Sequence, residues 1–342
     1  MHKPWTIGTA TAAAVLMLAA GNASAQYAVS QLPALTPSPP TNIVMTVDDS
    51  GSMQWAYVPD SMGDNAGTRR FDAGSYNALA YNPNITYPAP VMITSAGTQQ
   101  LTSSFTAAPI DGFNTAAGTV DLSTNYQPTQ SYSPGSSSQQ FAPAPSQDTA
   151  LICAPAATCT GAPAYYYVYK ATLTGCTSSS TDDNCYQYVR VSATSGLGGT
   201  DERQNFANWY SFYRIRHLMI ASAAAITMAD PVLTQARVTW RDFWTCTDLT
   251  AGNTCAGWDG AVVDNRIRPF TGAQRTNFYQ WLARVPANQS TPTRTTWQNI
   301  GDYFSNTSLG GNSPYGLNPN PLTGTAPNTE LACVQNYNIT LT

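Results

Sequence analysis

The segment Asn42 to Met53, NIVMTVDDSGSM, constrains the fold of this chain more than any other. Ile43 to Val47 is too short for a helix, is rich in β-branched residues and has turn-forming residues on both sides, so it is predicted to be a buried strand. Asp48, Ser50 and Ser52 follow on the loop that leaves this strand. In an open α/β sheet, ligand sites gather at the carboxyl ends of the strands. The segment therefore predicts an α/β fold with a polar site at this strand end.

This loop presents hard oxygen atoms to a cation. Asp48 supplies a carboxylate, Ser50 and Ser52 supply hydroxyls at alternate positions, and Gly51 is expected to allow the tight turn between them. Such ligands favour Mg²⁺, Mn²⁺ or Ca²⁺ over zinc. The alternative is an ordinary polar turn, since Asp, Ser and Gly are common in turns. The DxSxS pattern resembles the first motif of the metal-ion-dependent adhesion site of von Willebrand factor A domains, which implies a metal site.

The first 25 residues have the pattern of a secretory signal peptide. A basic start (His2, Lys3) precedes an apolar stretch from about Ile7 to Ala20, and residues 23–25, ASA, form a small-x-small cleavage site. No later stretch is long and apolar enough to span a bilayer. An exported chain is therefore expected, with residues 26–41 as a linker. The net charge of -4 provides no basic field for nucleic acid.

Seven cysteines in an exported chain are expected to be mostly disulfide-bonded. None has the close CxxC spacing of a zinc site. Their spacing suggests three local pairs, which are Cys153 with Cys159, Cys176 with Cys185, and Cys246 with Cys255. Cys333 is left over, and either its partner is missing, which we favour, or it is a buried reduced thiol.

Residues 54–204 are predicted to form a large insertion. Residues 94–147 are low in charge and rich in Ser, Thr, Gln, Ala and Pro, and structureless stretches of this length usually mark an insertion or a functional surface. Two strands, Tyr165–Leu173 and Tyr186–Ser192, are predicted to form a hairpin closed by a disulfide between Cys176 and Cys185.

Regular patterning resumes at Asn205. Apolar residues at spacings of three and four predict one long amphipathic helix that ends before Pro231. His217, the one histidine outside the signal peptide, lies within that helix and is interpreted as an ordinary packed or surface side chain. The remaining predicted elements are strands at 236–244, 266–270 and 337–341 and helices at 273–283 and 295–304. Thr291 lies just before the last helix, where its hydroxyl is a natural N-cap and equally a candidate metal ligand.

The order of these elements resembles the first part of a von Willebrand factor A domain, formed by residues 42–53 and 205–342. The amino-acid sequences of four segments resemble those of the PilY family of exported type IV pilus biogenesis factors and tip-associated adhesins. These segments are DDSGSM at 48–53, YNALAYNPNITYPAP at 76–90, QNFANWYSFYRIRHLM at 204–219 and STPTR at 290–294. The resemblance implies an α/β, Rossmann-type open sheet with flanking helices, incomplete at its C-terminus, with a loop-rich insertion that carries a β-hairpin.

The same resemblance implies a metal site built from Asp48, Ser50, Ser52 and Thr291, with Asp49 in support. The third motif of A domains is an aspartate within a Thr-Asp-Gly turn, and the chain stops at Thr342, one residue before it. The chain is therefore expected to be truncated, to lack the family's β-propeller, and to bind Mg²⁺, Mn²⁺ or Ca²⁺ weakly. Truncation would also account for the solitary Cys333.

The function that the resemblance implies is type IV pilus biogenesis and tip-associated adhesion, with surface sensing as an extension. The expected partners are minor pilins at the pilus tip and a host or abiotic surface ligand whose acidic group completes the metal's coordination. The expected location is the periplasm in transit, then the pilus tip, cell surface or outer membrane. Two alternatives remain, a secreted metal-dependent adhesin without a pilus role and a metal-assisted hydrolase. The second is disfavoured by the single mature histidine and the absence of a nucleophile elbow, and no catalytic residue is assigned.

Overall fold

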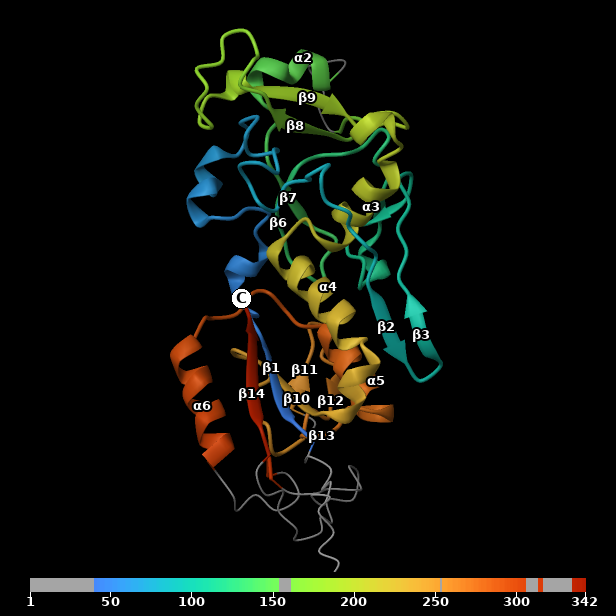
Figure 1. The fold of residues 1–342 in the computed structure, drawn as a ribbon, viewed down its shortest axis with the longest axis vertical. Helices are drawn as coiled ribbons and strands as arrows, with labels where there is room; N and C mark the ends of the chain where they lie inside the picture. Colours follow the sequence, from blue (N-terminus) through green and yellow to red (C-terminus); the bar gives the residue numbers. More distant parts are fainter. Residues whose placement is uncertain (1–39, 154–160, 253, 306–312, 316–333) are drawn as a thin grey trace, which may run out of the picture. The chain divides into compact units, whose positions relative to one another are not determined.

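The main sheet is open and has four strands in the order β13-β10-β1-β14 (Figure 1). The computed structural model describes residues 40–153, 161–252, 254–305, 313–315 and 334–342. β1 (Asn42–Val47) pairs in parallel with β10 (Arg237–Asp242) on one side and with β14 (Asn336–Leu341) on the other. β13 (Arg268–Pro269) pairs antiparallel with β10. The predicted open α/β sheet is confirmed, and three parallel strands end at one edge.

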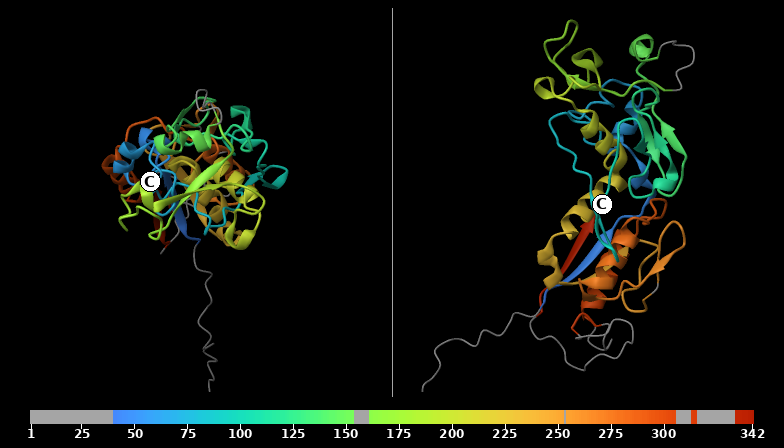
Figure 2. Two further views of the ribbon diagram at one scale, coloured as in Figure 1. Left: turned by 90° about the horizontal axis from the view of Figure 1, so that it is seen from above. Right: turned by 90° about the vertical axis from the view of Figure 1, so that its right-hand side faces the viewer.

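Helices cover both faces of this sheet (Figures 1 and 2). The odd-numbered residues of β1 pack against α4 (Arg216–Met228) and α5 (Gly272–Leu282). Val44 faces the other way and packs with Ile300 of α6 (Thr293–Ser305). Successive side chains of a strand point to opposite faces, so burial on both faces explains the continuous apolar run that predicted β1. The predicted boundaries of α5, α6 and β14 agree with the structure to within two residues.

The single long helix predicted from Asn205 is wrong, because α3 (Arg203–Phe212) and α4 stand in its place. Between them, Ile215 has an extended backbone with φ −128° and ψ 160°, and its side chain is buried against Ala56. α3 packs in one core and α4 in another. Each helix is amphipathic by itself, so apolar periodicity continues through the break and does not reveal that the two helices face different cores.

The chain leaves the sheet after Trp55 and returns to it at Arg216. The backbone N–H of Arg216 donates to the carbonyl oxygen of Trp55 at 3.1 Å. The Arg216 guanidinium donates to the carbonyl oxygen of Tyr57 at 2.9 and 2.7 Å, pairs with Asp60 at 2.7 Å, and lies over the rings of Trp55 and Tyr57. We call Trp55, Tyr57, Asp60 and Arg216 the neck. The segment between Trp55 and Arg216, which we call the insertion from here on, thus begins and ends at one point.

Much of the insertion folds around α3, whereas Met92 and Ile93 of its first hairpin pack against the core of the sheet. Its short elements are the antiparallel pairs β2 (Val91–Thr94) with β3 (Gly97–Gln100), β4 (Ala108–Pro109) with β5 (Thr119–Val120), β6 (Thr129–Tyr132) with β7 (Gln139–Phe141) and β8 (Tyr165–Tyr169) with β9 (Tyr186–Arg190), together with α2 (Thr149–Ile152). The β8–β9 hairpin and its Cys176–Cys185 disulfide were predicted and are confirmed. Residues 94–147, which are low in charge and rich in a few small or polar residue types, therefore do form strands and helical turns.

Aromatic side chains, mostly tyrosines, form the core of this insertion. The hydroxyls of Tyr81 and Tyr166 donate to the buried carboxylate of Glu202 at 3.2 and 3.1 Å. A tyrosine buries a large apolar ring and brings a polar group that finds a partner, so a chain with few aliphatic residues here can still build a core. Other buried members are Tyr126, Tyr165, Tyr167, Tyr186, Tyr210, Phe206 and Trp209.

A disulfide between Cys246 and Cys255 is present, as predicted, and β11 (Cys255–Ala256) pairs with β12 (Val262–Val263) beside it. The other proposed pair includes Cys159, which lies outside the described residues, as do Cys333 and residues 1–39 with the predicted signal peptide. None of the helices in the described ranges has the length and apolar character needed to cross a bilayer.

Candidate metal centre

The residues that follow the three parallel strands lie at one edge of the sheet. Val47, the last residue of β1, lies level with Asp242 of β10 and with Leu341 of β14. The backbone N–H of Asp48 continues the pairing and donates to the carbonyl oxygen of Leu341 at 2.9 Å. The residues that follow these strands are therefore neighbours, at the edge where ligand sites of open sheets lie.

The three residues of the DxSxS motif lie close together. Asp48 is 2% exposed; its Oδ1 accepts a hydrogen bond from the backbone N–H of Ser50 at 2.8 Å, and the Oγ atoms of Ser50 and Ser52 are 3.2 Å apart. The Thr342 hydroxyl donates to Asp48 Oδ2 at 2.6 Å. Sequence reasoning did not assign Thr342 to the site, although its position directly after the last predicted strand was a usable signal.

The loop that carries Thr291 is hydrogen-bonded to the same place. The N–H of Gln289 donates to the carbonyl oxygen of Asp49 at 2.9 Å, and the N–H of Gly51 donates to the carbonyl oxygen of Gln289 at 3.0 Å. Thr291 itself is exposed, two residues farther along. The first helical hydrogen bond of α6 runs to the carbonyl oxygen of Pro292, and the N–H of Thr293 donates to the carbonyl oxygen of Thr291 at 2.9 Å. Both roles of the Thr291 hydroxyl, helix cap and metal ligand, stay predictions.

Asp49 belongs to a second acidic group beneath this edge. Its Oδ2 accepts hydrogen bonds from the backbone N–H and the hydroxyl of Thr245, at 3.3 and 3.2 Å. Burial raises the pKa of Asp49 to about 6, and burial together with the charge of Asp49 raises the pKa of Asp242 to about 8. Asp49 Oδ1 and Asp242 Oδ2 have no hydrogen-bond partner within the described part of the chain. Asp242 was missed, although an acidic residue at the end of a predicted strand indicated it.

His217 is packed near this edge, in agreement with one of its two interpretations. It lies in the first turn of α4 and is 4% exposed. Burial lowers the pKa of His217 to about 4, and the charge of Asp48 only partly opposes that shift. The imidazole is therefore neutral at physiological pH.

The donor set fits a hard cation. One carboxylate and the hydroxyls of Ser50, Ser52 and Thr342 are oxygen ligands of the kind that Mg²⁺ or Ca²⁺ accepts, usually together with water. Among the residues that the structure describes, no three His, Cys, Asp or Glu side chains gather in a way that could hold a metal. A cation at this edge would therefore depend on hydroxyl ligands.

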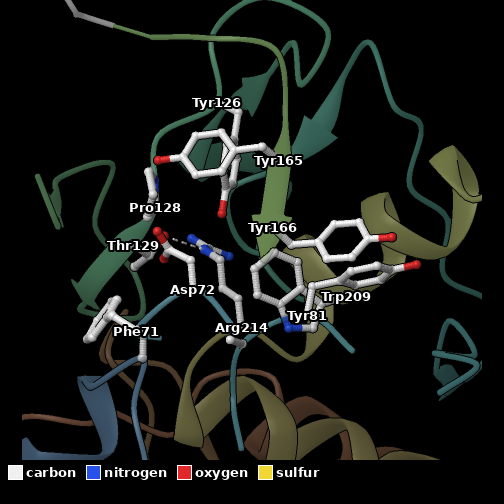
Figure 3. Close-up of a pocket in the computed structure, with 12 residues that line it drawn as sticks. Phe71, Asp72, Tyr81, Tyr126, Pro128, Thr129, Tyr165, Tyr166, Trp209 and Arg214 are labelled. Carbon is white, nitrogen blue, oxygen red and sulfur yellow. Dashed lines mark hydrogen bonds between the residues drawn. The ribbon is translucent and has the colours of Figure 1, made fainter. Parts of the chain in front are cut away.

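A small hollow in the insertion is part of its core (Figure 3). Its volume is about 20 Å³, and Asp72, Tyr126, Trp209 and Arg214 are among the residues that line it. The Arg214 guanidinium donates from Nε to the Thr129 hydroxyl at 3.1 Å. A space of this size holds about one water molecule, so it does not accommodate an organic substrate.

The comparisons with known proteins give one consistent result. The chain is 34% identical over 345 residues to the type IV pilus biogenesis factor PilY1 of Pseudomonas aeruginosa strain PAK, 33% identical over 346 residues to PilY1 of strain PAO1, and 32% identical over 317 residues to PilY1 of strain UCBPP-PA14. No family model and no solved structure matches it. The matches cover 98%, 98% and 89% of this chain but only 26%, 26% and 24% of the relatives.

The chain thus spans about a quarter of the length of these relatives. Those matches include every segment on which the resemblance to the PilY family was based, since they extend over nearly the whole chain. The predicted resemblance is confirmed, and over the quarter that they share this chain is a member of the PilY1 family of type IV pilus biogenesis factors.

Proposed function

We propose that this chain is the metal-dependent adhesive region of a type IV pilus biogenesis factor, exported and presented at the pilus tip. The names of its relatives support the pilus role. The order of the sheet, with a central β1 followed by DxSxS and an antiparallel edge strand, supports a von Willebrand factor A-like domain. No enzymatic role is proposed.

The observation that carries the proposal is the convergence of Asp48, Ser50, Ser52 and Thr342 at one strand end, with the loop of Thr291 hydrogen-bonded alongside. Asp48 would hold the cation through its carboxylate, and the hydroxyls would contribute neutral oxygen atoms. A bound Mg²⁺ or Mn²⁺ would offer a coordination position to a carboxylate of the partner. Buried Asp49 and its hydrogen bonds to Thr245 keep the loop in place.

Asp48 is the one carboxylate in the proposed ligand set, and Mg²⁺ gives up its water reluctantly. We therefore expect the protein without its partner to bind the metal weakly. A partner's Asp or Glu supplies the second negative ligand, so metal and partner bind more tightly together than either does alone. The loops of the insertion lie on a folded scaffold, as recognition loops commonly do. Adhesion that depends on the cation follows from this arrangement.

The test compares Asp48→Ala with Asp201→Ala, an exposed carboxylate that pairs with Arg203. Calorimetry with Mg²⁺ and Mn²⁺ is expected to show binding to the unmodified protein and to Asp201→Ala, and a loss of more than about tenfold in affinity for Asp48→Ala, because its one carboxylate is removed. Circular dichroism verifies that each variant is folded. Equal binding by both variants, or none by the unmodified protein, contradicts the proposal.

In cells, Asp48→Ala is expected to reduce attachment to surfaces. Deletion of the whole gene is expected to reduce the number of pili. Electron microscopy of pili and counts of attached cells measure these two effects separately. Normal pili after deletion of the gene would contradict the pilus role. The metal site would then be tested by the calorimetry alone. Normal attachment by the Asp48→Ala strain would remove the adhesive role of the site.

A further inference from the structure

His217, in the first turn of α4, carries a buried ring nitrogen that no group in the described residues satisfies. Its side chain is 4% exposed, and Nδ1 has no hydrogen-bond partner there. A neutral imidazole has one donor and one acceptor nitrogen. Native proteins rarely leave such a group buried without a partner, and the usual explanation is a bound ion or water. The unsatisfied nitrogen therefore indicates a ligand beside the ring.

The path of α4 brings its first turn to the edge of the sheet where β1 ends. The N–H of Trp55 donates to the carbonyl oxygen of Ser52, and the N–H of Arg216 donates to the carbonyl oxygen of Trp55. The start of α4 is thus fastened to the motif loop. The helix leads to β10, whose first residue is level with the first residue of β1. α4 therefore runs antiparallel to β1, from its last residues to its first.

The face of α4 that carries His217 is the face that packs on the sheet. Ala221 and Ala224, four and seven positions later, belong to the same core as Met45 and Val47 of β1. Side chains at these spacings lie along one face of a helix. His217 therefore lies one turn beyond Ala221, toward the residues that follow Val47.

The electrostatics of the ring agree with this position. Burial lowers the pKa of His217, and the charge of Asp48 opposes that shift, alone among the charged groups that the structure describes. The imidazole therefore lies within electrostatic reach of the Asp48 carboxylate. It is neutral at physiological pH, which is the form in which an imidazole nitrogen binds a metal.

We propose that His217 is a nitrogen ligand of the candidate metal site and shifts its preference from Mg²⁺ toward Mn²⁺ and other transition metals. This inference rests on the proposed metal site, whose other ligands are the oxygen atoms of Asp48 and the neighbouring hydroxyls. Imidazole is a common ligand of transition metals, whereas Mg²⁺ prefers oxygen ligands and retains its water molecules. A cation at this position would also satisfy the buried ring nitrogen.

The experiment uses Mn²⁺ as the probe and the full chain purified without a polyhistidine tag. Pulsed electron paramagnetic resonance detects the nitrogen nucleus of an imidazole that coordinates Mn²⁺. The chain has 2 histidines, so His2→Ala is the matched control. A nitrogen signal is expected from the unmodified protein and from His2→Ala. It is expected to be absent from His217→Leu and His217→Gln, because neither new side chain is an imidazole.

Calorimetry measures the effect of the same substitutions on metal preference. His217→Leu is expected to bind Mn²⁺ about tenfold more weakly than the unmodified protein, as is typical when a group that supports a metal site is removed. Its affinity for Mg²⁺ is expected to change by less than about twofold, because Mg²⁺ accepts water in place of the nitrogen. Circular dichroism verifies that each variant is folded, and His217→Gln serves if His217→Leu is not.

The outcomes separate this inference from the metal site. Mn²⁺ binding without a nitrogen signal in the unmodified protein, or a signal that persists in a folded His217 variant, overturns the role of His217 and leaves the metal site standing. Equal losses of Mn²⁺ and Mg²⁺ affinity in the His217 variants overturn the proposed preference. Absence of Mn²⁺ binding by the unmodified protein overturns the metal site, and this inference with it.

Discussion

Burial controls the protonation of several carboxyl groups in this protein. Besides Asp49 and Asp242 at the sheet edge, Asp111 has its pKa raised to about 6 and Asp72 to about 8, in each case chiefly by burial. Asp111 accepts hydrogen bonds from the backbone N–H of Phe113 and from the Tyr132 hydroxyl, which partly offset the burial. No side-chain hydrogen bond reaches Asp72 from the described residues, which makes it the clearest case for a test.

Replacing Asp72 by asparagine is expected to make stability less dependent on pH. Its pKa is 3.8 when exposed and about 8 in the fold, so between these values the folded state holds a proton that the unfolded state releases. The free energy of unfolding of the unmodified protein therefore falls as pH rises through that window. Asp72→Asn does not titrate, and it is expected to be more stable than the unmodified protein by about 1–3 kcal/mol at pH 8 and by less at pH 5.

Urea unfolding at the two pH values measures this difference. Asp121→Asn is the control, because Asp121 is only partly buried and its hydrogen bonds with Ser123 lower its pKa. It is expected to gain no stability at pH 8 relative to pH 5. A gain for Asp72→Asn that is the same at both pH values would show that Asp72 is ionised in the fold.

Among the elements, α3 is the helix around which much of the insertion packs, and a loop approaches its C-terminal end closely. Its last residue, Phe212, is fully buried, and the backbone N–H of Gly112 donates to the carbonyl oxygen of Ser211 at 2.9 Å. A Cβ on Gly112 would collide with the Phe212 ring. Gly112 is therefore required by close packing of a loop against a helix.

Gly112→Ala is expected to lower the free energy of unfolding by about 1–3 kcal/mol, as overpacked core substitutions do. Gly51→Ala is the matched control. The expectation that Gly51 is needed for a tight turn is not supported by its surroundings, since a Cβ there meets nothing within 4 Å and its φ is not positive. Thermal unfolding of both variants makes the comparison. Equal stability of the two variants would contradict this account of α3.

The described part of the chain contains two large hydrophobic cores, and the neck lies where the chain passes from one to the other. One core lies between the sheet and helices α4 and α5, and the other is the aromatic core of the insertion. The neck lies directly after η1 (Gly51–Gln54), the short 3₁₀ helix that contains Ser52. Arg216 of α4 thus contacts Trp55, Tyr57 and Asp60, which follow η1 directly.

Arg216→Ala is expected to loosen this junction. The variant loses charged hydrogen bonds to the Tyr57 carbonyl oxygen and an ion pair with Asp60, so we expect a loss of about 1–3 kcal/mol in stability and faster amide hydrogen exchange in residues 55–60. Arg203→Ala, which breaks an exposed pair with Asp201, is expected to change stability by less than about 0.5 kcal/mol. If exchange in residues 55–60 is unchanged in Arg216→Ala, the neck does not join the two cores.

The sequence by itself determined the elements whose signals are local. The strand before Asp48, the hairpin closed by Cys176 and Cys185, and the boundaries of α5, α6 and β14 depend on alternation, turn residues and short spacings that a chain carries wherever it folds. The DxSxS loop was recognisable for the same reason, because its carboxylate and hydroxyl side chains come from five consecutive residues.

Only the tertiary structure decided which distant residues meet. It divided the predicted long helix at Ile215, because that side chain packs against Ala56 and residues on either side face different cores. It also brought Thr342 to Asp48 and Thr245 to Asp49, across 294 and 196 positions of the chain. The spacing of apolar residues indicates that a side chain is buried. The residues that it packs against are decided by the path of the whole chain.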